Sequence, residues 1–291
     1  MVYVRKFILP SDRAEIGVID GEKRTCFNTF YPFKIFPDKG ISEVSFDDVT
    51  VFYGGNGSGK STLINVMSRK VDADRYSEFN DAPLFDKYVG MCSVDYARRP
   101  KKSCVLTSDD VFDYVLNART VNENIDDRRN ELFEEYVATK HEVIGNPEIM
   151  HLKGLDDYER WSKTMEILSP RRSQSSFVRK RVARDVDLHS NGETAMRYFL
   201  DRIDEDALYF LDEPENSLSI ELQIQLAEYI AATARATRSQ FIIATHSPII
   251  LSMKNAKIYN LDSYPASVST WTELPNVRKY FEFFMEHKDE F

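Results

Sequence analysis

The chain has 291 residues, of which 42% are hydrophobic and 29% charged, with a formal net charge of −9. This length suits one large domain or two small ones with a sizeable core, and the acidic balance argues against a molecule-wide non-specific surface for nucleic acid, although a local basic patch stays compatible with it. The three cysteines are an odd number without C-x-x-C spacing, which favours buried thiols over disulfides or zinc. No apolar run approaches the ~18 residues of a membrane span, and the first ten residues do not resemble a signal peptide, so we expect a cytoplasmic protein without a membrane partner.

The first sixty residues alternate short apolar runs with turn residues, a pattern typical of strands. We expect strands at Phe7–Pro10, Phe33–Pro37, Val44–Phe46 and Val49–Tyr53, the last running directly into a glycine-rich loop. These strands predict an antiparallel N-terminal β part beside a mixed or parallel central sheet.

The pattern then changes to charged sequence with helical spacing between Asp109 and about Ile167. We expect a mainly helical lid or insertion over residues 105–187 within a single domain of residues 1–291. Beyond it, residues 194–203 and 219–235 read as helices, and 207–211 and 241–244 as buried strands. Over residues 271–291, apolar side chains recur at helical spacing from Val277, which predicts a C-terminal helix packed back on the core.

The glycine-rich loop matches the pattern G-x-x-x-x-G-K-[ST] in full and lies between an apolar strand and an amphipathic helix, as that pattern requires. Its glycines let successive backbone N–H groups converge on phosphate oxygens, and the helix N-terminus adds positive potential. We expect Lys60 to reach the β- and γ-phosphates and the Ser61 hydroxyl to bind Mg²⁺. The predicted nucleotide-binding residues of this loop are Gly54, Gly55, Asn56, Gly57, Ser58, Gly59, Lys60, Ser61 and Thr62.

Two carboxylates, Asp212 and Glu213, directly follow the predicted strand 207–211. In open α/β sheets, ligands bind at the carboxyl ends of the strands, where the phosphate loop also lies. We expect Asp212 to hold Mg²⁺ through water and Glu213 to act as the general base toward the attacking water. Acidic residues after a strand also serve as simple helix caps, but the complete phosphate loop favours the catalytic interpretation.

A histidine, His246, terminates the other predicted strand, 241–244, within Thr245-His246-Ser247-Pro248. A lone histidine is commonly structural. Its position at the end of a strand in the same sheet favours a sensor of the γ-phosphate.

Together with Ser190-Asn191-Gly192-Glu193, which is similar to a signature motif, these segments resemble the ABC ATPase superfamily, over residues 42–70 and 188–250. The sequence is most similar to its soluble RecF-like and SMC-like branch. The resemblance implies an α/β P-loop fold and a dimer that encloses ATP and Mg²⁺, in which Ser190, Gly192 and Glu193 complete the site of the opposite protomer. Taken alone, Ser190 and Glu193 also form a capping box at a helix start.

Two features fit the resemblance less simply. The superfamily has a glutamine soon after the phosphate-loop helix, but this chain has none before Gln174, so we look for a substitute in Ser108–Asp110 after a strand at 104–107. A basic run consists of Arg171, Arg172, Arg179, Lys180, Arg181 and Arg184. Two interpretations stay open for it: a solvated linker, or a contact for nucleic acid or an acidic partner. A smaller cluster consists of Arg98, Arg99, Lys101 and Lys102.

These patterns predict an ATPase that forms a homodimer around two ATP and uses the cycle to switch an effector protein or clamp nucleic acid, as in DNA repair or phage defence. One alternative is the nucleotide-binding subunit of an ABC transporter. The residues after Gly192 and Glu213 argue against it, since they lack the continuations typical of transporter ATPases. Another is an ATP-gated binding module with negligible turnover.

Overall fold

A computed structural model of the chain describes residues 2–22, 29–79, 81–145, 158–168, 174–179, 181–182 and 191–291. The chain divides into two compact units, one formed by residues 1–113 with 190–291 and the other by residues 114–189. Among the described residues, no helix combines the length and apolar character needed to cross a membrane.

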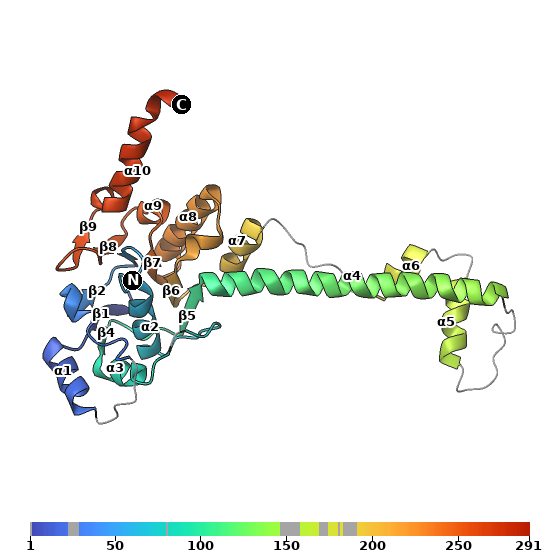
Figure 1. Cartoon of the computed structure of the whole chain (residues 1–291), viewed down its shortest axis with the longest axis horizontal. Helices are drawn as coiled ribbons and strands as arrows, with labels where there is room; N and C mark the ends of the chain where they lie inside the picture. Colours follow the sequence, from blue (N-terminus) through green and yellow to red (C-terminus); the bar gives the residue numbers. More distant parts are fainter. Residues whose placement is uncertain are drawn as a thin grey trace. The chain divides into compact units, whose positions relative to one another are not determined.

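The first unit is built on a six-stranded sheet (Figure 1). Its strand order is β5-β6-β7-β3-β8-β9; the first five strands are parallel, and β9 is antiparallel to β8. The bounds are β3 (Val49–Tyr53), β5 (Lys102–Thr107), β6 (Ala207–Asp212), β7 (Gln240–Thr245), β8 (Lys257–Asn260) and β9 (Ser267–Ser269). The predicted α/β class with a largely parallel central sheet is confirmed.

A second, antiparallel sheet of three strands in the order β2-β1-β4 forms the N-terminal β part. Its strands are β1 (Val4–Ile8), β2 (Glu43–Ser45) and β4 (Ser93–Tyr96). The side chain of Gln240 joins the two sheets, because its Oε1 accepts from the backbone N–H of Tyr3 and Val4, each at 2.9 Å. A buried amide with all its partners in place fixes the start of β7 against β1.

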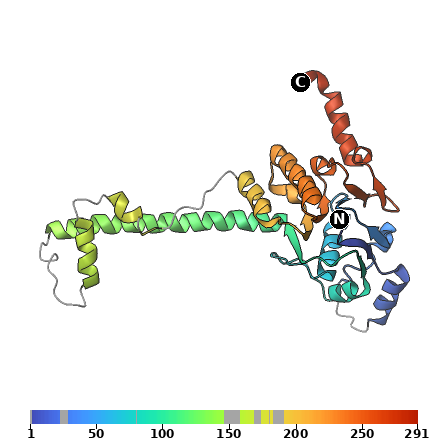
Figure 2. The same cartoon turned by 180° about the vertical axis from the view of Figure 1, so that it is seen from behind.

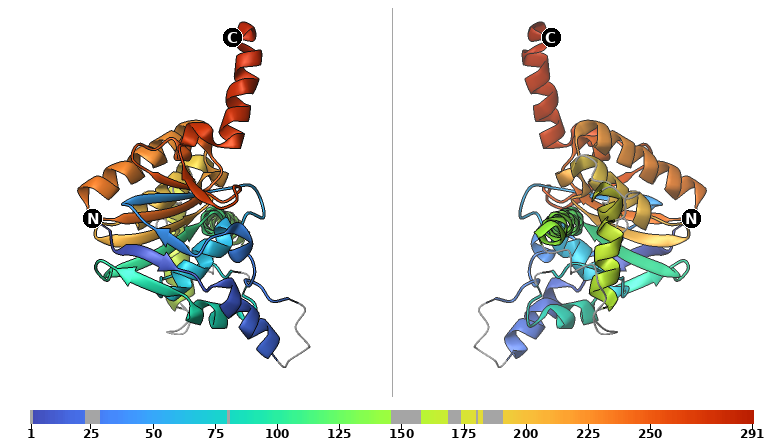
Figure 3. Two further views of the ribbon diagram at one scale, coloured as in Figure 1. Left: turned by 90° about the vertical axis from the view of Figure 1, so that its left-hand side faces the viewer. Right: turned by 90° about the vertical axis from the view of Figure 1, so that its right-hand side faces the viewer.

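Helices cover both faces of the large sheet (Figure 3). On one face, α2 (Lys60–Lys70) and α3 (Phe85–Met91) share a core with the small sheet, and Phe52, Phe210 and Ile242 point into it. On the other face, α8 (Ile220–Ala236) packs on β7 and α7 (Asn191–Arg202) packs on α8. Since successive strand residues alternate between faces, the burial of every residue of β3 and β7 shows that both faces of these strands are covered.

In the N-terminal region one expected strand is absent from the described residues, and one helix was not expected. Residues 33–37 form turns that lead into the short 3₁₀ helix η1 (Pro37–Lys39), because Phe33 and Phe36 both bury against the ring of Tyr88 on α3. The helix α1 (Asp12–Gly21) was not anticipated. It begins at Ser11, whose hydroxyl accepts from the N–H of Ala14.

The second unit has a small core of its own. Its helices are the part of α4 (Ser108–Gly145) from Tyr114 onward, α5 (Tyr158–Leu168) and α6 (Gln174–Arg179). Leu132 and Tyr136 of α4 pack with Ile167 and Val178.

The remaining helices lie after β6 in the chain: η4 (Pro214–Ser217), α9 (Pro248–Leu251), η5 (Trp271–Glu273), α10 (Pro275–Glu286) and η6 (Lys288–Glu290). The C-terminal helix α10 exists as predicted, but it does not pack back on the core. Only Val277 is buried, and the helix extends away from the sheet (Figures 1 and 2). The apolar residues of α10 do recur at helical spacing, but the outer turns of this helix do not pack against the described core of the first unit.

Candidate nucleotide site

The phosphate loop connects β3 to α2 and is held in a shape that only glycine permits at several positions. Gly57 and Gly59 have φ angles of 78° and 92°, in the left-handed region. A Cβ on Gly54 would lie 2.5 Å from Ser58 Oγ and 2.7 Å from Ser58 Cβ. These positions explain why the sequence places glycines there.

The loop has the features of an anion cradle. Gly59 forms the N-cap of α2, so the first free N–H groups of the helix point toward the loop. The hydroxyl of Ser58 is buried and has no hydrogen-bond partner in the described part of the chain. An orphaned donor at a helix N-terminus fits a phosphate oxygen.

Lys60 lies across the loop, 4% exposed. Its Nζ donates to the carbonyl oxygens of Gly54 at 2.8 Å and Gly55 at 3.2 Å, and lies 3.6 Å from Glu213 Oε1. The ammonium therefore sits between the phosphate loop and the predicted general base.

Ser61 and Asp212 meet across the sheet edge. The Ser61 hydroxyl donates to Asp212 Oδ1 at 3.0 Å, although 151 positions separate the two residues. Burial raises the pKa of Asp212 from 3.8 to about 6, and the charge of Glu213 adds to this, while the Ser61 hydrogen bond and the charges of Arg75 and Lys60 act in the opposite direction. A hydroxyl and a carboxylate are hard oxygen ligands of the kind that Mg²⁺ prefers.

Glu213 follows the strand β6 in a left-handed conformation, with φ 48° and ψ 53°. Its N–H donates to the carbonyl of Ala244 at 2.8 Å, and its Oε2 accepts from Asn216 Nδ2 at 3.0 Å. A non-glycine residue in this region is strained, and such strain clusters at functional sites. The unusual backbone turns the Glu213 carboxylate toward Lys60.

His246 follows β7 and approaches the same carboxylates. Its Nδ1 lies 3.7 Å from Glu213 Oε1 and 3.4 Å from Glu215 Oε1, and its side chain is half exposed. The parallel register of β6 and β7, with Asp212 beside Ala244, brings the two strand ends together. The sequence-predicted residues of the phosphate loop, the acidic pair and His246 thus converge on one edge.

Glu215 is a residue to which the sequence interpretation gave no role. Its buried Oε1 accepts from Thr245 Oγ1 at 2.6 Å, His246 N at 3.0 Å and Ser247 N at 3.2 Å. It therefore fixes the His246 loop to the segment that carries Glu213. Only its place in Pro-Glu-Asn-Ser-Leu, after the acidic pair, signals it in the sequence.

Two more unanticipated side chains hold the loop. Asp262, after β8, accepts from Gly55 N at 2.8 Å, and the Tyr31 hydroxyl donates to Thr62 Oγ1 at 3.0 Å. Burial raises the pKa of Tyr31, so it remains a neutral donor. No motif marks either residue.

The predicted signature lies partly outside the described residues, which begin again at Asn191. Helix α7 starts there, and Ser190 lies outside the described residues. The atoms nearest to a Cβ on Gly192 are Leu222 Cδ1 at 2.7 Å and Ser217 O at 3.9 Å. Gly192 and Glu193 are therefore presented beside α8 and η4, and the nearest neighbours of Gly192 do not belong to the phosphate loop.

The search for a glutamine substitute leads to the start of α4. Asp110 is buried and its two oxygens accept from Ser77 N at 2.9 Å and Thr107 N at 2.8 Å, so it is occupied in capping this junction. Asp109 is exposed, and Thr107 pairs in register with Asp212. The junction thus lies beside the proposed magnesium ligand.

The basic run is described only at Arg179 and Arg181, and its other members lie outside the described residues. Arg181 pairs with Glu166. In the smaller cluster, Lys102 pairs with Asp204 at 2.5 Å and Arg99 stacks over Tyr96 at 5.5 Å. These contacts favour a structural role within the chain, rather than a contact with nucleic acid, for Arg181, Lys102 and Arg99.

Known proteins provide the context for this geometry. Residues 109–252 match a family model described as "AAA domain, putative AbiEii toxin, Type IV TA system". Over 236 residues, or 78% of this chain and 81% of the relative, the sequence is 23% identical to the petrobactin import ATP-binding protein YclP of Bacillus subtilis (strain 168).

Solved structures similar to the chain include two SMC heads. One is the Smc head domain with an extended coiled coil bound to the C-terminal domain of ScpA from Pyrococcus furiosus, at 13% identity and a TM-score of 0.40, with 99% of this chain and 100% of that chain covered. The other is the SMC head domain from Thermotoga maritima, at 12% identity and a TM-score of 0.37, with 92% and 99% covered.

Proposed function

Because the chain is an ATP-binding P-loop protein that carries an AAA domain and has an ABC-type relative, we propose that it hydrolyses ATP within a homodimer. The observation that carries this proposal is the convergence of Ser61, Asp212, Lys60 and Glu213 at the carboxyl ends of β3 and β6. This is the constellation that phosphoryl transfer to water requires: a phosphate cradle, a metal site and a carboxylate base.

The residues of the phosphate loop have different roles in binding ATP. The N–H groups of residues 54–62 surround the phosphates, and Lys60 exchanges the carbonyls of Gly54 and Gly55 for β- and γ-phosphate oxygens. Ser61 and Asp212, which are hydrogen-bonded to each other, would hold Mg²⁺. The metal ion, when bound, neutralises charge that develops on the phosphates.

Glu213 and His246 act in hydrolysis. Glu213 accepts a proton from the attacking water as the water oxygen bonds to the γ-phosphorus and the bond to the β–γ bridging oxygen breaks. His246 donates a hydrogen bond to the γ-phosphate. Its Nδ1 lies 3.7 Å from Glu213 Oε1, beside the proposed general base.

The second protomer completes the site in this proposal. Ser190, Gly192 and Glu193 at the start of α7 present a helix N-terminus, which is an anion site for the γ-phosphate of ATP bound to the opposite chain. ATP binding then closes the dimer and hydrolysis reopens it. This cycle switches an effector protein or clamps nucleic acid through the second unit.

A second candidate function is the nucleotide-binding subunit of a transporter, favoured by the import ATP-binding protein among the relatives. It requires association with a membrane partner. Capture of the chain from detergent-solubilised membranes of its source cells, set against capture from cytosol, separates the two candidates. Recovery of an integral membrane protein in a fixed ratio to the chain supports the transporter.

The proposal is tested with Glu213→Gln. This variant keeps the phosphate and metal contacts, so ATP affinity is unchanged, while loss of the base lowers turnover by a factor of ~10² to 10⁴. The variant accumulates as an ATP-bound dimer, measured by light scattering. Turnover close to that of the unmodified chain removes Glu213 from its role, and turnover below detection in the unmodified chain, with and without DNA, leaves the ATP-gated binding module.

A further inference from the structure

The segment of residues 29–41, which we call the strap, lies against the first turn of α2. The hydroxyl of Tyr31 in the strap donates to Thr62 Oγ1 at 3.0 Å. A Cβ on Gly59, the N-cap of α2, would lie 3.1 Å from Ile35 Cγ2. The strap therefore meets the phosphate loop at the point where the loop becomes a helix.

A buried carboxylate holds the strap in place. Glu15 of α1 is inaccessible to solvent, and its Oε2 accepts from the backbone N–H of Lys34 at 2.5 Å, while its Oε1 accepts from the Tyr88 hydroxyl at 3.0 Å. Lys34 has a φ of 70°, in the left-handed region that residues with a side chain seldom adopt. A buried charge is costly unless its hydrogen bonds are made, so Glu15 fixes the backbone of the strap between Tyr31 and Ile35.

The ring of Tyr31 has a packing partner of its own. It stacks on Phe85 of α3, with ring centroids 6.1 Å apart and planes inclined by 21°. Burial raises the pKa of Tyr31, so its hydroxyl keeps its proton at neutral pH. Removal of the hydroxyl alone therefore leaves the ring contact intact and deletes one hydrogen-bond donor.

The direction of the bond between Tyr31 and Thr62 determines what the Thr62 hydroxyl can do. A hydroxyl has one proton to donate and two lone pairs that accept. Since Tyr31 donates to Thr62 Oγ1, it occupies a lone pair, and the described residues provide no acceptor for the proton of Thr62. Threonine hydroxyls in helices otherwise tend to bond back to a carbonyl of the preceding turn. Tyr31 thus keeps Thr62, whose side chain is partly exposed, as a donor for a ligand.

Helix geometry indicates which phosphate this proton meets. In a phosphate loop the backbone N–H groups surround the α- and β-phosphates, the lysine reaches the β- and γ-phosphates, and the next hydroxyl binds Mg²⁺. Lys60 and Ser61 approach Glu213 and Asp212, on the side where the γ-phosphate and the metal are proposed to bind. Successive residues of a helix are turned by about 100°, so Thr62 leaves that side and faces the strap. Its hydroxyl is therefore next to the phosphate nearest to the nucleoside.

We propose that Tyr31 is a positioning residue for nucleotide binding, whose hydroxyl directs the proton of Thr62 toward the α-phosphate. This inference rests on the proposed nucleotide site, but it requires neither hydrolysis nor a dimer. ADP and ATP share the α-phosphate, so the contact strengthens the binding of both. In this it differs from His246, whose proposed partner is present only in ATP.

The first test is Tyr31→Phe, which removes the hydroxyl and keeps the ring. We expect the affinity for ADP with Mg²⁺, measured by isothermal titration calorimetry, to fall about 10-fold through loss of a hydrogen bond to a charged group. Turnover at saturating ATP stays within about 2-fold, because the lost contact is equal in the ground state and the transition state. Normal ADP affinity in a folded Tyr31→Phe chain overturns the proposal.

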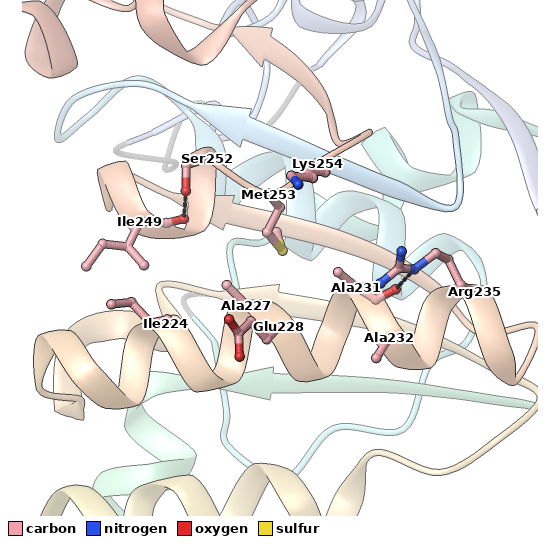
Figure 4. A pocket seen from close by; sticks show the side chains of 10 residues that line it. All are labelled: Ile224, Ala227, Glu228, Ala231, Ala232, Arg235, Ile249, Ser252, Met253 and Lys254. Carbon is pink, nitrogen blue, oxygen red and sulfur yellow. Dashed lines mark hydrogen bonds between the residues drawn. The ribbon is translucent and has the colours of Figure 1, made fainter.

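Two control variants remove hydroxyl hydrogen bonds elsewhere in the chain. Tyr229→Phe deletes the hydroxyl of α8 that donates to Ile203 O at 3.1 Å. Ser252→Ala deletes a hydroxyl that donates to Ile249 O at 2.7 Å, in a groove of about 560 Å³ beside α8 and α9 that Figure 4 shows. Both controls keep the ADP affinity of the unmodified chain. Circular dichroism and thermal unfolding confirm that each variant is folded.

A double-mutant cycle tests whether Tyr31 acts through Thr62. Thr62→Val removes the hydroxyl at similar shape and lowers ADP affinity about 10-fold. In this background Tyr31→Phe causes no further loss, because the group that it positions is absent, whereas independent effects multiply. Thr62→Ser keeps a hydroxyl and restores the sensitivity to Tyr31→Phe. Losses that multiply in the Thr62→Val chain overturn the positioning role.

The two proposals fail separately. A chain that binds ADP through Tyr31 and Thr62 but does not hydrolyse ATP contradicts the proposed function and leaves the positioning role in place. A chain whose hydrolysis depends on Glu213, with normal ADP affinity in Tyr31→Phe, overturns the positioning role alone. An unmodified chain that binds no ADP overturns both.

Discussion

The carboxylate of Glu215 and the hydroxyl of Thr245 are joined by a hydrogen bond of 2.6 Å between η4 and the end of β7. The same oxygen of Glu215 accepts from the N–H groups of His246 and Ser247, so one buried group orients the whole turn after β7. Hydrogen bonds to a charged, buried acceptor are stronger than neutral ones. This turn is therefore a rigid support for His246 rather than a loose loop.

Replacement of Glu215 is expected to lower the stability of the folded chain. Glu215→Ala leaves the His246 N–H and the Thr245 hydroxyl without their acceptor, while the Ser247 N–H keeps its second acceptor, Thr245 Oγ1 at 2.9 Å. We expect the free energy of unfolding to fall by about 2–4 kcal/mol. Urea denaturation measures it. The control Glu228→Ala removes an exposed carboxylate from α8 and changes stability little. Equal stability of the Glu215 and Glu228 variants contradicts the role of Glu215.

Glu215→Gln tests the positioning of His246 separately from the stability of the fold. It keeps one carbonyl acceptor of similar shape, so the fold survives, while weaker hydrogen bonds loosen the His246 turn. We expect kcat to fall about 10-fold with ATP affinity unchanged, since His246 acts on the γ-phosphate during hydrolysis. Stopped-flow phosphate release and nucleotide titration measure the two quantities. Unchanged kcat in a variant of normal affinity contradicts the positioning role.

The buried Asp212 predicts an unusual pH dependence. Its pKa is about 6 in the folded chain against 3.8 ordinarily, so the folded state binds more protons between these values and loses stability as the pH rises through this window. The loss is at most about 3 kcal/mol, reduced by the partial exposure of the group. Asp212→Asn removes this term, and its nucleotide-free form is therefore more stable than the unmodified chain at pH 7, but not at pH 4.

Urea denaturation at pH 4, 5 and 7 checks this expectation without ligand. Addition of Mg²⁺ and ATP stabilises the unmodified chain at pH 7 more than Asp212→Asn, because the variant keeps the phosphate contacts but lacks one of the two metal-binding groups. A parallel pH profile for the two chains contradicts the inferred cost of burying Asp212.

The close approach of Gly54 to Ser58 leads to a prediction about the phosphate loop. Gly54→Ala places a Cβ 2.5 Å from Ser58 Oγ, which forces the phosphate loop apart and lowers ATP affinity by about 10- to 100-fold. Gly90→Ala is the matched control, since nothing lies within 4 Å of its Cβ and alanine suits α3. Titration with a fluorescent ATP analogue measures both. Normal affinity in Gly54→Ala shows that the loop tolerates this position.

The residues of the candidate nucleotide site could be predicted from the sequence because they form local motifs. The glycines, Lys60 and Ser61 stand within eight positions, and Asp212 and His246 each end an apolar strand. Parallel pairing of β6, β7 and β3 then brings these strand ends to one edge. The P-loop resemblance itself is confirmed by the AAA-domain match and the ATP-binding relative.

Residues that act through tertiary contacts could not be read in this way. Asp262 reaches Gly55 only because β8 pairs with β3, and that strand has no distinctive pattern. Phe33 and Phe36 resemble strand residues, but burial against Tyr88 imposes turns. For α10, the apolar spacing predicts a helix correctly and says nothing about which surface covers it.

The last prediction concerns whether each nucleotide site uses two chains. A lesion in the signature should disturb the fold as little as possible, and a Cβ on Gly192 requires the Leu222 side chain to shift from 2.7 Å, so Ser190 is the position chosen. Ser190→Arg, before the start of α7, places bulk and charge at the N-terminus that is proposed to face the partner's γ-phosphate. Both Ser190→Arg and Glu213→Gln are nearly inactive alone.

In a mixed dimer, the Ser190→Arg chain offers an intact phosphate loop and Glu213, and the Glu213→Gln chain offers an intact signature. One site is then whole and the other carries both lesions. With random exchange half of the dimers are mixed, so about a quarter of the unmodified activity returns if the two sites fire independently. Phosphate release from exchanged mixtures measures this return, and mass analysis with one tagged chain shows that mixed dimers form. If mixed dimers form and neither steady-state nor single-turnover hydrolysis exceeds that of the separate variants, the signature does not complete the opposite site.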